Sequence, residues 1–476
     1  MLSPTSQTQV SDQNGQPFAT AARIQSQVLA LYANTRNGQY LGGRFQVYND
    51  VKADNWINDS GNQITASNTW AENVNTTSTE VINFWSQAYY TINLCNVFID
   101  GMAKTGTAVV GSTLGANYVG EAKFLRALAY YSLLQLYARP YADGNGAKPG
   151  LPLRLIGLST YSDQSLAKST VAQVYAQITK DLDDAETGLP LIYGTAAAPN
   201  ALNNTIRAHR NTAIAFKTRV YLTMGQYDKV ITEANKIVSA TAPFTATTGV
   251  ANALQANVAN VYKTPYTTTE SILSMPFVIS TEQVGTQNAL GYYYYANGSV
   301  AGNAEFHLNP TGVIADPNWK ATDARRTNFI VASTVTANVG KYYLAKWTNI
   351  GTYLDYAPVM RYAEVLLNLA EARARINGVD GQAIALLNAV RQRSDATTTF
   401  TAGGFANGTA LVNAILQERN IEFLGEGLRN IDYMRTLGTI PAKSNIQAVA
   451  PSNPQYIWPL SNDELLYNTL IGGSNN

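Results

Sequence analysis

The feature that most constrains this sequence is a set of long apolar stripes at helical spacing. In residues 168–190, apolar side chains recur every three or four positions, which places them on one face of a helix. Thr170 and Gln173 match a capping box at the start of this segment, and Gly188 and Pro190 end it. Such stripes must be buried against other elements, so the sequence predicts a scaffold of packed helices.

Two further stretches each predict a pair of helices. Residues 210–238 contain two helical patterns that meet at Met224–Tyr227, with small alanines where the helices should touch. Residues 358–393 repeat this arrangement, with Pro358 expected near the first helical turn and Gly378 near the bend. Each pair resembles a tetratricopeptide unit, and the irregular spacing favours a few such pairs over a long array.

Long polar stretches separate the helical segments. Residues 36–79 and 240–356 are rich in Asn, Thr, Gly and aromatic residues, with short strands expected around 271–280 and 341–347. Loops of this length are uncommon in compact proteins unless they have a function. We predict a mainly α-helical fold with a few short strands, in which the scaffold carries these two insertions. The expected scaffold segments are residues 18–35, 80–139, 168–239 and 358–437.

The second insertion contains four consecutive tyrosines, Tyr292, Tyr293, Tyr294 and Tyr295. In a strand this run would place two rings on each side, because successive side chains face opposite ways. One pair would then pack on the scaffold while the other faces a ligand. The alternative is that all four rings are buried, as aromatic residues often are.

Charged side chains are scarce in this chain. They make up 14% of the residues, against about 25% in a typical protein, and the net charge is +1 without any basic run. This composition argues against a nucleic-acid-binding surface. A neutral surface rich in hydroxyl and amide groups suits uncharged polar ligands. No apolar stretch reaches the ~18 residues of a membrane-spanning helix, and residues 1–30 contain no signal-peptide core.

The motifs of common active sites and metal sites are missing. The chain has only 2 histidines, far apart, and neither a nucleophile elbow nor a phosphate-binding loop, so no zinc site and no cofactor are expected. Asp and Asn oxygens in residues 49–62 also suit a calcium ion, but without EF-hand spacing a solvated loop is the favoured interpretation. Cys95, the only cysteine, lies on an apolar helical stretch and is expected in the core.

The densest ionic stretch is residues 418–435. Its spacing predicts ion pairs between Glu426 and Arg429, between Arg429 and Asp432, and between Asp432 and Arg435. One interpretation is a pair of catalytic carboxylates, and the other is a structural network. The structural interpretation is favoured, because neighbouring arginines lower the pKa of a carboxyl group and make it a poor proton donor.

Several ordered motifs together resemble the SusD/RagB family. In the second half these are "VMRYAEVLLNLAEARARIN", "VRQRSDA", "ILQERNIEFLGEGLRNIDYMR" and "IWPLSNDELLYN", and in the first half "INFWSQAYYTINLCNVFI" and "GEAKFLRALAYYSLLQLYARPY". The resemblance extends from about residue 18 to the C-terminus. We therefore interpret residues 1–476 as a single SusD-like domain.

This resemblance implies a scaffold of four tetratricopeptide helix pairs and an outer-membrane lipoprotein of Bacteroidetes, exposed on the extracellular face. Such proteins bind nutrients, usually glycans, without catalysis, and deliver them to a SusC-like TonB-dependent transporter. The membrane anchor would be an N-terminal lipidated cysteine that follows a signal peptide. Neither is contained in this chain, so the anchor is inferred from the family.

The resemblance also implies a ligand site made of aromatic and polar side chains from the variable loops. Flat rings would cover the C–H faces of a sugar, and polar groups would bond its hydroxyls. For Trp56 and Trp70, in a polar loop, exposure or ligand contact is favoured over burial. The expected ligand-binding residues are Asp54, Trp56, Trp70, Asn73, Tyr292, Tyr293, Tyr294, Tyr295 and Trp319.

Three alternatives remain open from the sequence. Some members of the family bind peptides, so the cargo can be a peptide instead of a glycan. A glycoside hydrolase would use carboxylates such as Asp54 and Glu72 in the aromatic loop. A pure protein-interaction scaffold would use the tetratricopeptide-like helices to hold a partner protein.

Overall fold

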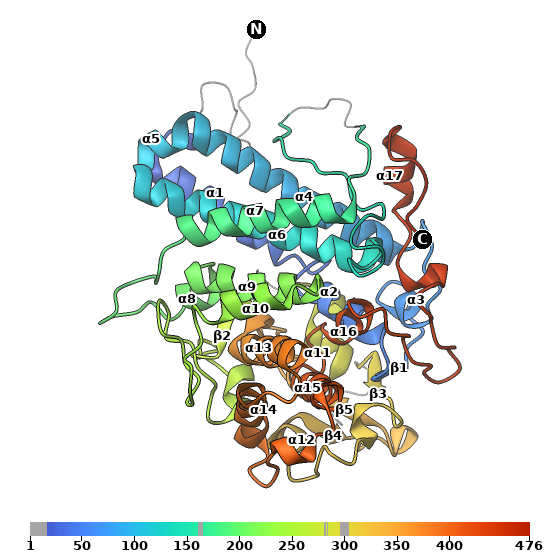
Figure 1. The fold of residues 1–476 in the computed structure, drawn as a ribbon. Coiled ribbons are helices and arrows are strands. Elements are labelled where there is room, and N and C mark those ends of the chain that lie inside the picture. The colour runs from blue at the N-terminus through green and yellow to red at the C-terminus, as the bar shows by residue number, and fades with distance from the viewer. Residues whose placement is uncertain (1–16, 160–164, 280–281, 283, 296–303) are drawn as a thin grey trace.

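The long helices pack side by side as the framework of the molecule (Figure 1). The structure is a computed structural model that describes residues 17–159, 165–279, 282, 284–295 and 304–476. Successive helices contact one another, α4 with α6, α6 with α7, and α7 with α9. The helices of this framework are α1 (Ala21–Thr35), α4 (Thr79–Gly101), α6 (Ser112–Tyr137), α7 (Val171–Gly188), α9 (Arg210–Thr223), the shorter α10 (Tyr227–Ala234), α13 (Tyr362–Asn377), α14 (Gly381–Ser394) and α15 (Gly408–Glu422).

Both predicted helix pairs are confirmed. The α9–α10 pair bends at Gly225, whose φ of 69° lies in the left-handed region that glycine adopts without strain. Ala213, Ala215 and Ala234 are fully buried, as expected of small residues at a close helix contact. In the second pair, α13 ends at Gly378, with φ 74°, before α14 begins. The mainly helical fold with tetratricopeptide-like pairing is therefore confirmed.

The strands are few and short, as predicted. They form three antiparallel pairs, β1 with β3, β2 with β6, and β4 with β5. The strands are β1 (Trp56–Asn58), β2 (Ser271–Met275), β3 (Phe306–Leu308), β4 (Ile330–Ala332), β5 (Tyr342–Leu344) and β6 (Ala357–Arg361). The prediction for Pro358 was wrong, because it lies in β6 and not in a helical turn. A two-stranded sheet leaves each strand one free edge, where the missing N–H of a proline is tolerated.

Short helices connect these elements. They are α2 (Arg44–Val51), α3 (Ser67–Trp70), α5 (Thr107–Val110), α8 (Asn203–Ile206), α11 (Leu290–Tyr294), α12 (Ala324–Phe329), α16 (Arg429–Met434) and α17 (Asn462–Tyr467). The predicted tyrosine strand was wrong, since the run begins inside α11 and the N–H of Tyr295 bonds the carbonyl of Gly291. In a helix, residues three apart share a face. Tyr292 and Tyr295 are accordingly both half-buried, while Tyr293 and Tyr294 are sealed in the core.

Candidate functional site

The two insertions meet at the small β1–β3 ribbon. Ile57 is paired with His307, and the N–H of Asp59 donates to the carbonyl of Glu305 at 2.8 Å. Because side chains alternate along a strand, Trp56 is directed inward while Ile57 and Asp59 are directed outward. We call the outer surface formed by Ile57, Asp59, Trp70, His307 and Lys341 the β1 face. It joins segments that lie 248 residues apart in the sequence.

Three charged or ionisable side chains of the β1 face form a cluster. The Asp59 carboxylate lies 2.8 Å from His307 Nδ1, and its other oxygen accepts a hydrogen bond from Lys341 Nζ at 2.6 Å. Burial acts to raise the pKa of Asp59, but the bonds from His307 and Lys341 outweigh it and hold the pKa below its usual value. The three side chains remain 12–30% exposed, so a ligand can reach them.

Glu305 fixes the loop beside this cluster. Its buried carboxylate accepts hydrogen bonds from Asn62 at 3.3 Å and Thr65 at 3.2 Å, and a further bond from Ser60. These contacts tie residues 60–65 to β3. The outer end of the β1 face is therefore held in one conformation before any ligand binds.

Trp56 is fully buried, so its predicted exposure was wrong. Its ring stacks on Tyr294, with ring centres 4.3 Å apart and an interplanar angle of 29°. Tyr294 in turn lies 6.0 Å from Trp347, and Tyr293 stacks on Phe306 at 6.3 Å. These rings fill the space between the two insertions. The sequence alone did not predict that they contact one another.

Trp70 is half-buried at the edge of the same ribbon. It ends α3, and its indole N–H donates to the backbone carbonyl of Trp56 at 2.7 Å. That bond fixes the ring beside β1 while part of it stays accessible. Asn73, three residues later, is exposed. Of the two loop tryptophans, only Trp70 is placed where a ligand can contact it.

Trp319 is buried and does not belong to the β1 face. Only 2% of it is exposed, and the guanidinium of Arg326 lies 5.3 Å from its ring centre. Arg326 also donates to the Trp319 carbonyl at 2.7 Å. The ring therefore packs as a core residue between an irregular turn and α12, and its expected place in a ligand site is contradicted by its burial.

Asp54 is held by residues of the C-terminal ionic segment. Its carboxylate accepts two hydrogen bonds from Arg429, both at 2.9 Å, and one from the Tyr433 hydroxyl at 2.8 Å. Burial raises its pKa, but Arg429 and Tyr433 reverse the effect, so the pKa is lowered overall. The Asp54 side chain, which is 16% exposed, thus links the segment before β1 to α16.

The ionic segment pairs mostly with other parts of the chain. The expected pair of Asp432 with Arg435 is present at 2.8 Å. The other two expected pairs were wrong, because Glu426 binds Arg361 at 2.7 Å and Arg429 binds Asp54. Helix α15 ends at Glu422 and α16 begins at Arg429, so the helical spacing that predicted the pair of Glu426 with Arg429 is interrupted between them. Arg429 and Asp432 share α16, but the guanidinium of Arg429 binds Asp54 instead.

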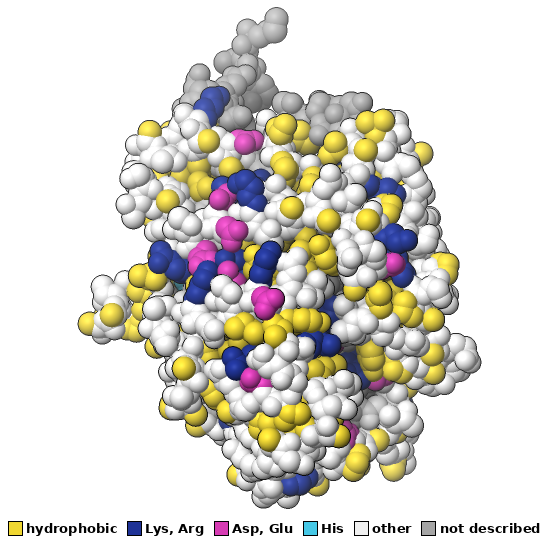
Figure 2. Space-filling model, in the orientation of Figure 1, with side chains coloured by type: hydrophobic (Ala, Val, Ile, Leu, Met, Phe, Trp, Pro, Cys, Tyr) yellow, Lys and Arg dark blue, Asp and Glu magenta, His cyan; other side chains and the backbone are white. Residues whose placement is uncertain are grey.

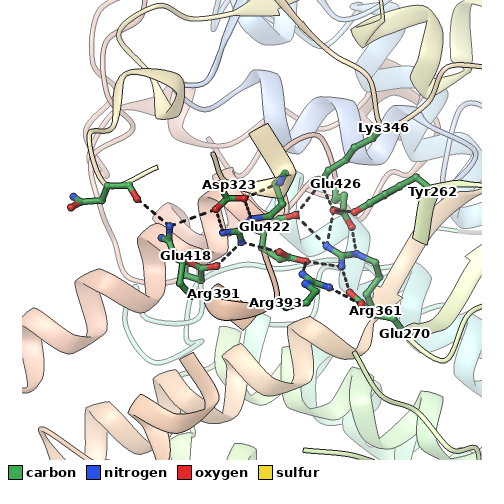
Figure 3. A network of polar contacts seen from close by, with 12 residues as sticks. Tyr262, Glu270, Asp323, Lys346, Arg361, Arg391, Arg393, Glu418, Glu422 and Glu426 are labelled. Carbon is green, nitrogen blue, oxygen red and sulfur yellow. Dashed lines mark hydrogen bonds and ion pairs between the residues drawn. The ribbon is translucent and has the colours of Figure 1, made fainter. Parts of the chain in front are cut away.

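A buried network of arginines and carboxylates joins β2, β6, α12, α14 and α15 (Figure 3). Arg325 binds Glu418 at 2.5 Å and Glu422 at 3.0 Å, and Arg393 bridges Glu422 and Glu270 at 2.5 and 2.7 Å. The figure shows these side chains converging from separate elements. Its labelled members are Tyr262, Glu270, Asp323, Lys346, Arg361, Arg391, Arg393, Glu418, Glu422 and Glu426.

The ionisation states of the carboxylates in this network indicate a structural role. Burial acts to raise the pKa of Glu422, but Arg393, Arg361 and Arg325 hold the pKa well below its usual range. The pKa of Asp432 is lowered to about 2 for the same kind of reason, with Arg419 and Arg435 as partners. Ionised carboxylates without access to solvent cannot donate a proton to a substrate. The geometry therefore agrees with a structural role.

Other candidate groups have protein partners as well. In the loop considered for calcium, Asp50 accepts from the N–H of Gly427 at 3.0 Å, and Asn55 donates to Asn420 at 2.6 Å. Among the described residues, no group of three or more His, Cys, Asp or Glu side chains is placed to hold a metal ion. Cys95 is buried in α4, where burial raises the pKa of its thiol to about 12, as expected of a core residue.

The surface is largely uncharged. Figure 2 shows charged side chains of both signs gathered near the middle of this face, while neutral polar and hydrophobic side chains cover most of the rest. Within the described part of the chain, no helix combines the length and the apolar character needed to cross a membrane.

Comparison with known proteins identifies relatives along the whole chain. The model of the SusD family matches residues 291–469, and a model described as "Starch-binding associating with outer membrane" matches residues 5–222. The solved structure of a SusD superfamily protein from Bacteroides fragilis is 33% identical, covers 96% of this chain and 99% of that chain, and has a TM-score of 0.82.

Two further relatives are more distant. SusD-like protein P2 of Formosa agariphila is 26% identical, over 96% of this chain and 93% of that protein. The structure of a laminarin-binding SusD-like protein is 21% identical, covers 96% of this chain and 99% of that chain, and has a TM-score of 0.74. At 21% identity, the similarity to the laminarin-binding protein shows a shared fold only.

Proposed function

This chain belongs to the SusD family, and from this premise we propose that it is a non-catalytic glycan-binding protein of the cell surface. In this proposal it captures an oligosaccharide or polysaccharide at the β1 face and delivers it to a SusC-like TonB-dependent transporter of the outer membrane. An N-terminal lipid anchor would hold it on the extracellular side. The family and the outer-membrane description of the matching model support this location.

The main support for this proposal is that the half-buried ring of Trp70 and a polar cluster lie on the same β1–β3 ribbon. Trp70 is bonded to the backbone of β1 at Trp56, and Asp59, which follows the other end of β1, contacts His307 of β3 and Lys341. A sugar ring presents an apolar C–H face and a rim of hydroxyls, which an indole ring and a donor–acceptor cluster can contact together.

Further groups extend this candidate site. Tyr292 in α11 and Tyr295 just after it are half-buried, and Asn73 is exposed after α3. We propose these three residues as additional contacts for a glycan longer than one sugar. One relative is described as laminarin-binding, which supports a glycan as the class of cargo.

The carboxylates near the β1 face do not suit hydrolysis. A glycosidase needs one carboxyl group with a raised pKa as its general acid. Asp54 and Asp59 both have lowered pKa values, and Glu72 is buried in an ion pair with Lys52. Burial raises the pKa of Asp50 to about 8 and that of Glu80 to about 7, but both side chains are at most 1% exposed. These features support binding without bond cleavage.

Isothermal titration calorimetry tests this function with laminarin, soluble starch and xylan oligosaccharides, beside a mixture of short peptides. We expect binding of at least one glycan and a loss of about tenfold or more in affinity with Trp70→Ala, since aromatic contacts dominate such interfaces. Tyr90→Ala is the matched control, because Tyr90 is 52% exposed on α4 and lies outside the β1 face.

The outcomes separate the alternatives. Binding of peptides alone would favour a peptide cargo. Equal affinity of Trp70→Ala and the unsubstituted protein would overturn the β1 face as the site. Release of shorter sugars during incubation with a bound glycan would contradict the absence of catalysis.

A further inference from the structure

A pocket lies away from the β1 face. Its lining residues belong to the segments around α8 and β2. Figure 1 shows these two elements on the left of the molecule and β1 and β3 on the right. The pocket has a volume of about 470 Å³ and is formed by residues 191–205, 249–251 and 267–271. We infer that this pocket binds a small, uncharged and largely apolar molecule. This inference does not depend on the glycan site.

One wall of the pocket is a hairpin held by a buried asparagine. The hairpin closes through a bridge between Gly194 and Pro199. The Asn204 side chain accepts from the N–H of Tyr193 at 2.8 Å and donates to the carbonyl of the same residue at 3.1 Å. Only 4% of Asn204 is exposed, so α8 fixes the hairpin from beneath.

A second buried asparagine holds the opposite wall. Asn211 in α9 donates to the carbonyls of Thr248 and Val250 at 2.8 and 3.0 Å. Gly249 between them has φ 70°, and a Cβ there would lie 3.0 Å from the carbonyl oxygen of Leu191. The two walls therefore come together at Gly249 and Leu191, and the space between them is preformed.

The floor of the pocket, which we define as residues 267–271, contains one acidic residue that does not face the pocket. Glu270 is fully buried and directs its carboxylate to Arg361 and Arg393, away from the pocket. Its neighbours Thr269 and Ser271 line the pocket, and the turn at residues 268–271 places the Glu270 side chain on the other side. Hydroxyl groups, not carboxylates, thus form the polar part of the floor.

The lining selects the class of ligand. The pocket presents aliphatic surface from Leu191, Ile192, Pro199 and Val250. Hydroxyl oxygens of the 267–271 segment, which already bond within the protein, can accept a few further hydrogen bonds. Among the described residues that line the pocket, none is ionisable and none is aromatic. A charged ligand would lose its hydration without a partner, and a bare sugar would lack a ring to stack on. An apolar body with one or two polar atoms matches this lining.

Two fluorescent probes test the inference with the full chain. 1-Anilinonaphthalene is uncharged, and 8-anilinonaphthalene-1-sulfonate has the same rings with one negative charge. We expect saturable binding of the uncharged probe and at least about tenfold weaker binding of the sulfonate, because the pocket offers no cation. Equal affinity for both probes, or no binding of the uncharged one, would overturn the proposal.

Substitutions then locate the binding. Ala251→Phe and Ala201→Phe fill the pocket from opposite walls, and each should weaken binding of the uncharged probe by about tenfold or more. Ala30→Phe, at an exposed alanine of α1, should leave it unchanged. Unchanged binding in both filled variants would overturn the assignment. So would loss of probe binding in Trp70→Ala, which would place the probe at the β1 face and leave the glycan proposal intact.

Discussion

Arg361 is the residue at which the structural interpretation of the buried network is most directly testable. Its Nη1 lies 2.5 Å from Glu270 and 2.9 Å from Glu422, and its Nε lies 2.7 Å from Glu426. The three carboxylates are at most 5% exposed. Arg361→Met keeps most of the side-chain volume and removes the charge that these carboxylates share.

The expected loss of stability follows from burial. Removing one partner of a buried ion pair costs about 3–5 kcal/mol, because the remaining charges stay out of water. Unfolding entropy is about 2.1 cal/mol/K per residue, so a chain of 476 residues has roughly 1 kcal/mol/K in total. The melting temperature of Arg361→Met should therefore fall by about 3–5 °C.

The loss should also depend on pH. Burial acts to raise the pKa of Glu422 and of Glu426, and arginines that include Arg361 lower both below the usual value. In the unsubstituted protein this contribution is present above the unfolded-state pKa of about 4.5 and is lost as pH falls. Without Arg361 the same pKa values rise, and both carboxyl groups take up protons more readily. The loss of stability in Arg361→Met, relative to the unsubstituted protein, should then be larger at pH 8 than at pH 5.

Differential scanning calorimetry of both proteins at pH 5 and pH 8 measures these effects. Lys180→Met is the control, since its pair with Asp184 at 2.9 Å is exposed and contributes less than about 1 kcal/mol. A drop in melting temperature no larger than that of the control would refute the reasoning. A deficit that is equal at the two pH values would refute the electrostatic part alone.

Three further predictions concern single residues. Trp56→Ala should lower the free energy of unfolding by about 3–5 kcal/mol in urea unfolding, because the fully buried ring stacks on Tyr294 of the other insertion. A loss below about 1 kcal/mol would contradict that packing. Gly427→Ala should cost roughly 1–3 kcal/mol in the same assay, since φ is 81° and its Cβ would lie 2.6 Å from the Cα of Gln46; full stability would show that the loop relaxes freely. His307→Ala should weaken glycan binding by about tenfold in calorimetry, because it removes a hydrogen-bonding partner of Asp59 from the charged cluster. Undiminished affinity would show that the cluster is not part of the glycan site.

Helical segments were predictable because their signals are local. The capping box of Thr170 and Gln173 is formed as expected, and the glycines at 225 and 378 stand at the predicted bends. Each of these signals depends on a few neighbouring residues. The short strands around 271–280 and 341–347 were also found, as β2 and β5.

The site was harder to predict because its contacts are long-range. Four identical tyrosines carry no periodicity, so the run could not distinguish a strand from the helix α11. Trp56 looked exposed in a polar loop because its partner Tyr294 comes from the other insertion. His307 was considered only for zinc, and nothing in the sequence pointed to its contact with Asp59. Such pairings depend on the folded chain.

The stack of Trp56 on Tyr294 limits how the binding specificity of this protein can be redesigned. Replacing only the first insertion by that of a relative would leave Tyr294 facing a foreign side chain, and replacing only the second would do the same to Trp56. Chimeras that exchange both loops as one unit should fold, whereas half-exchanges should be poorly expressed. Loop libraries for new sugars are best built with both rings kept constant.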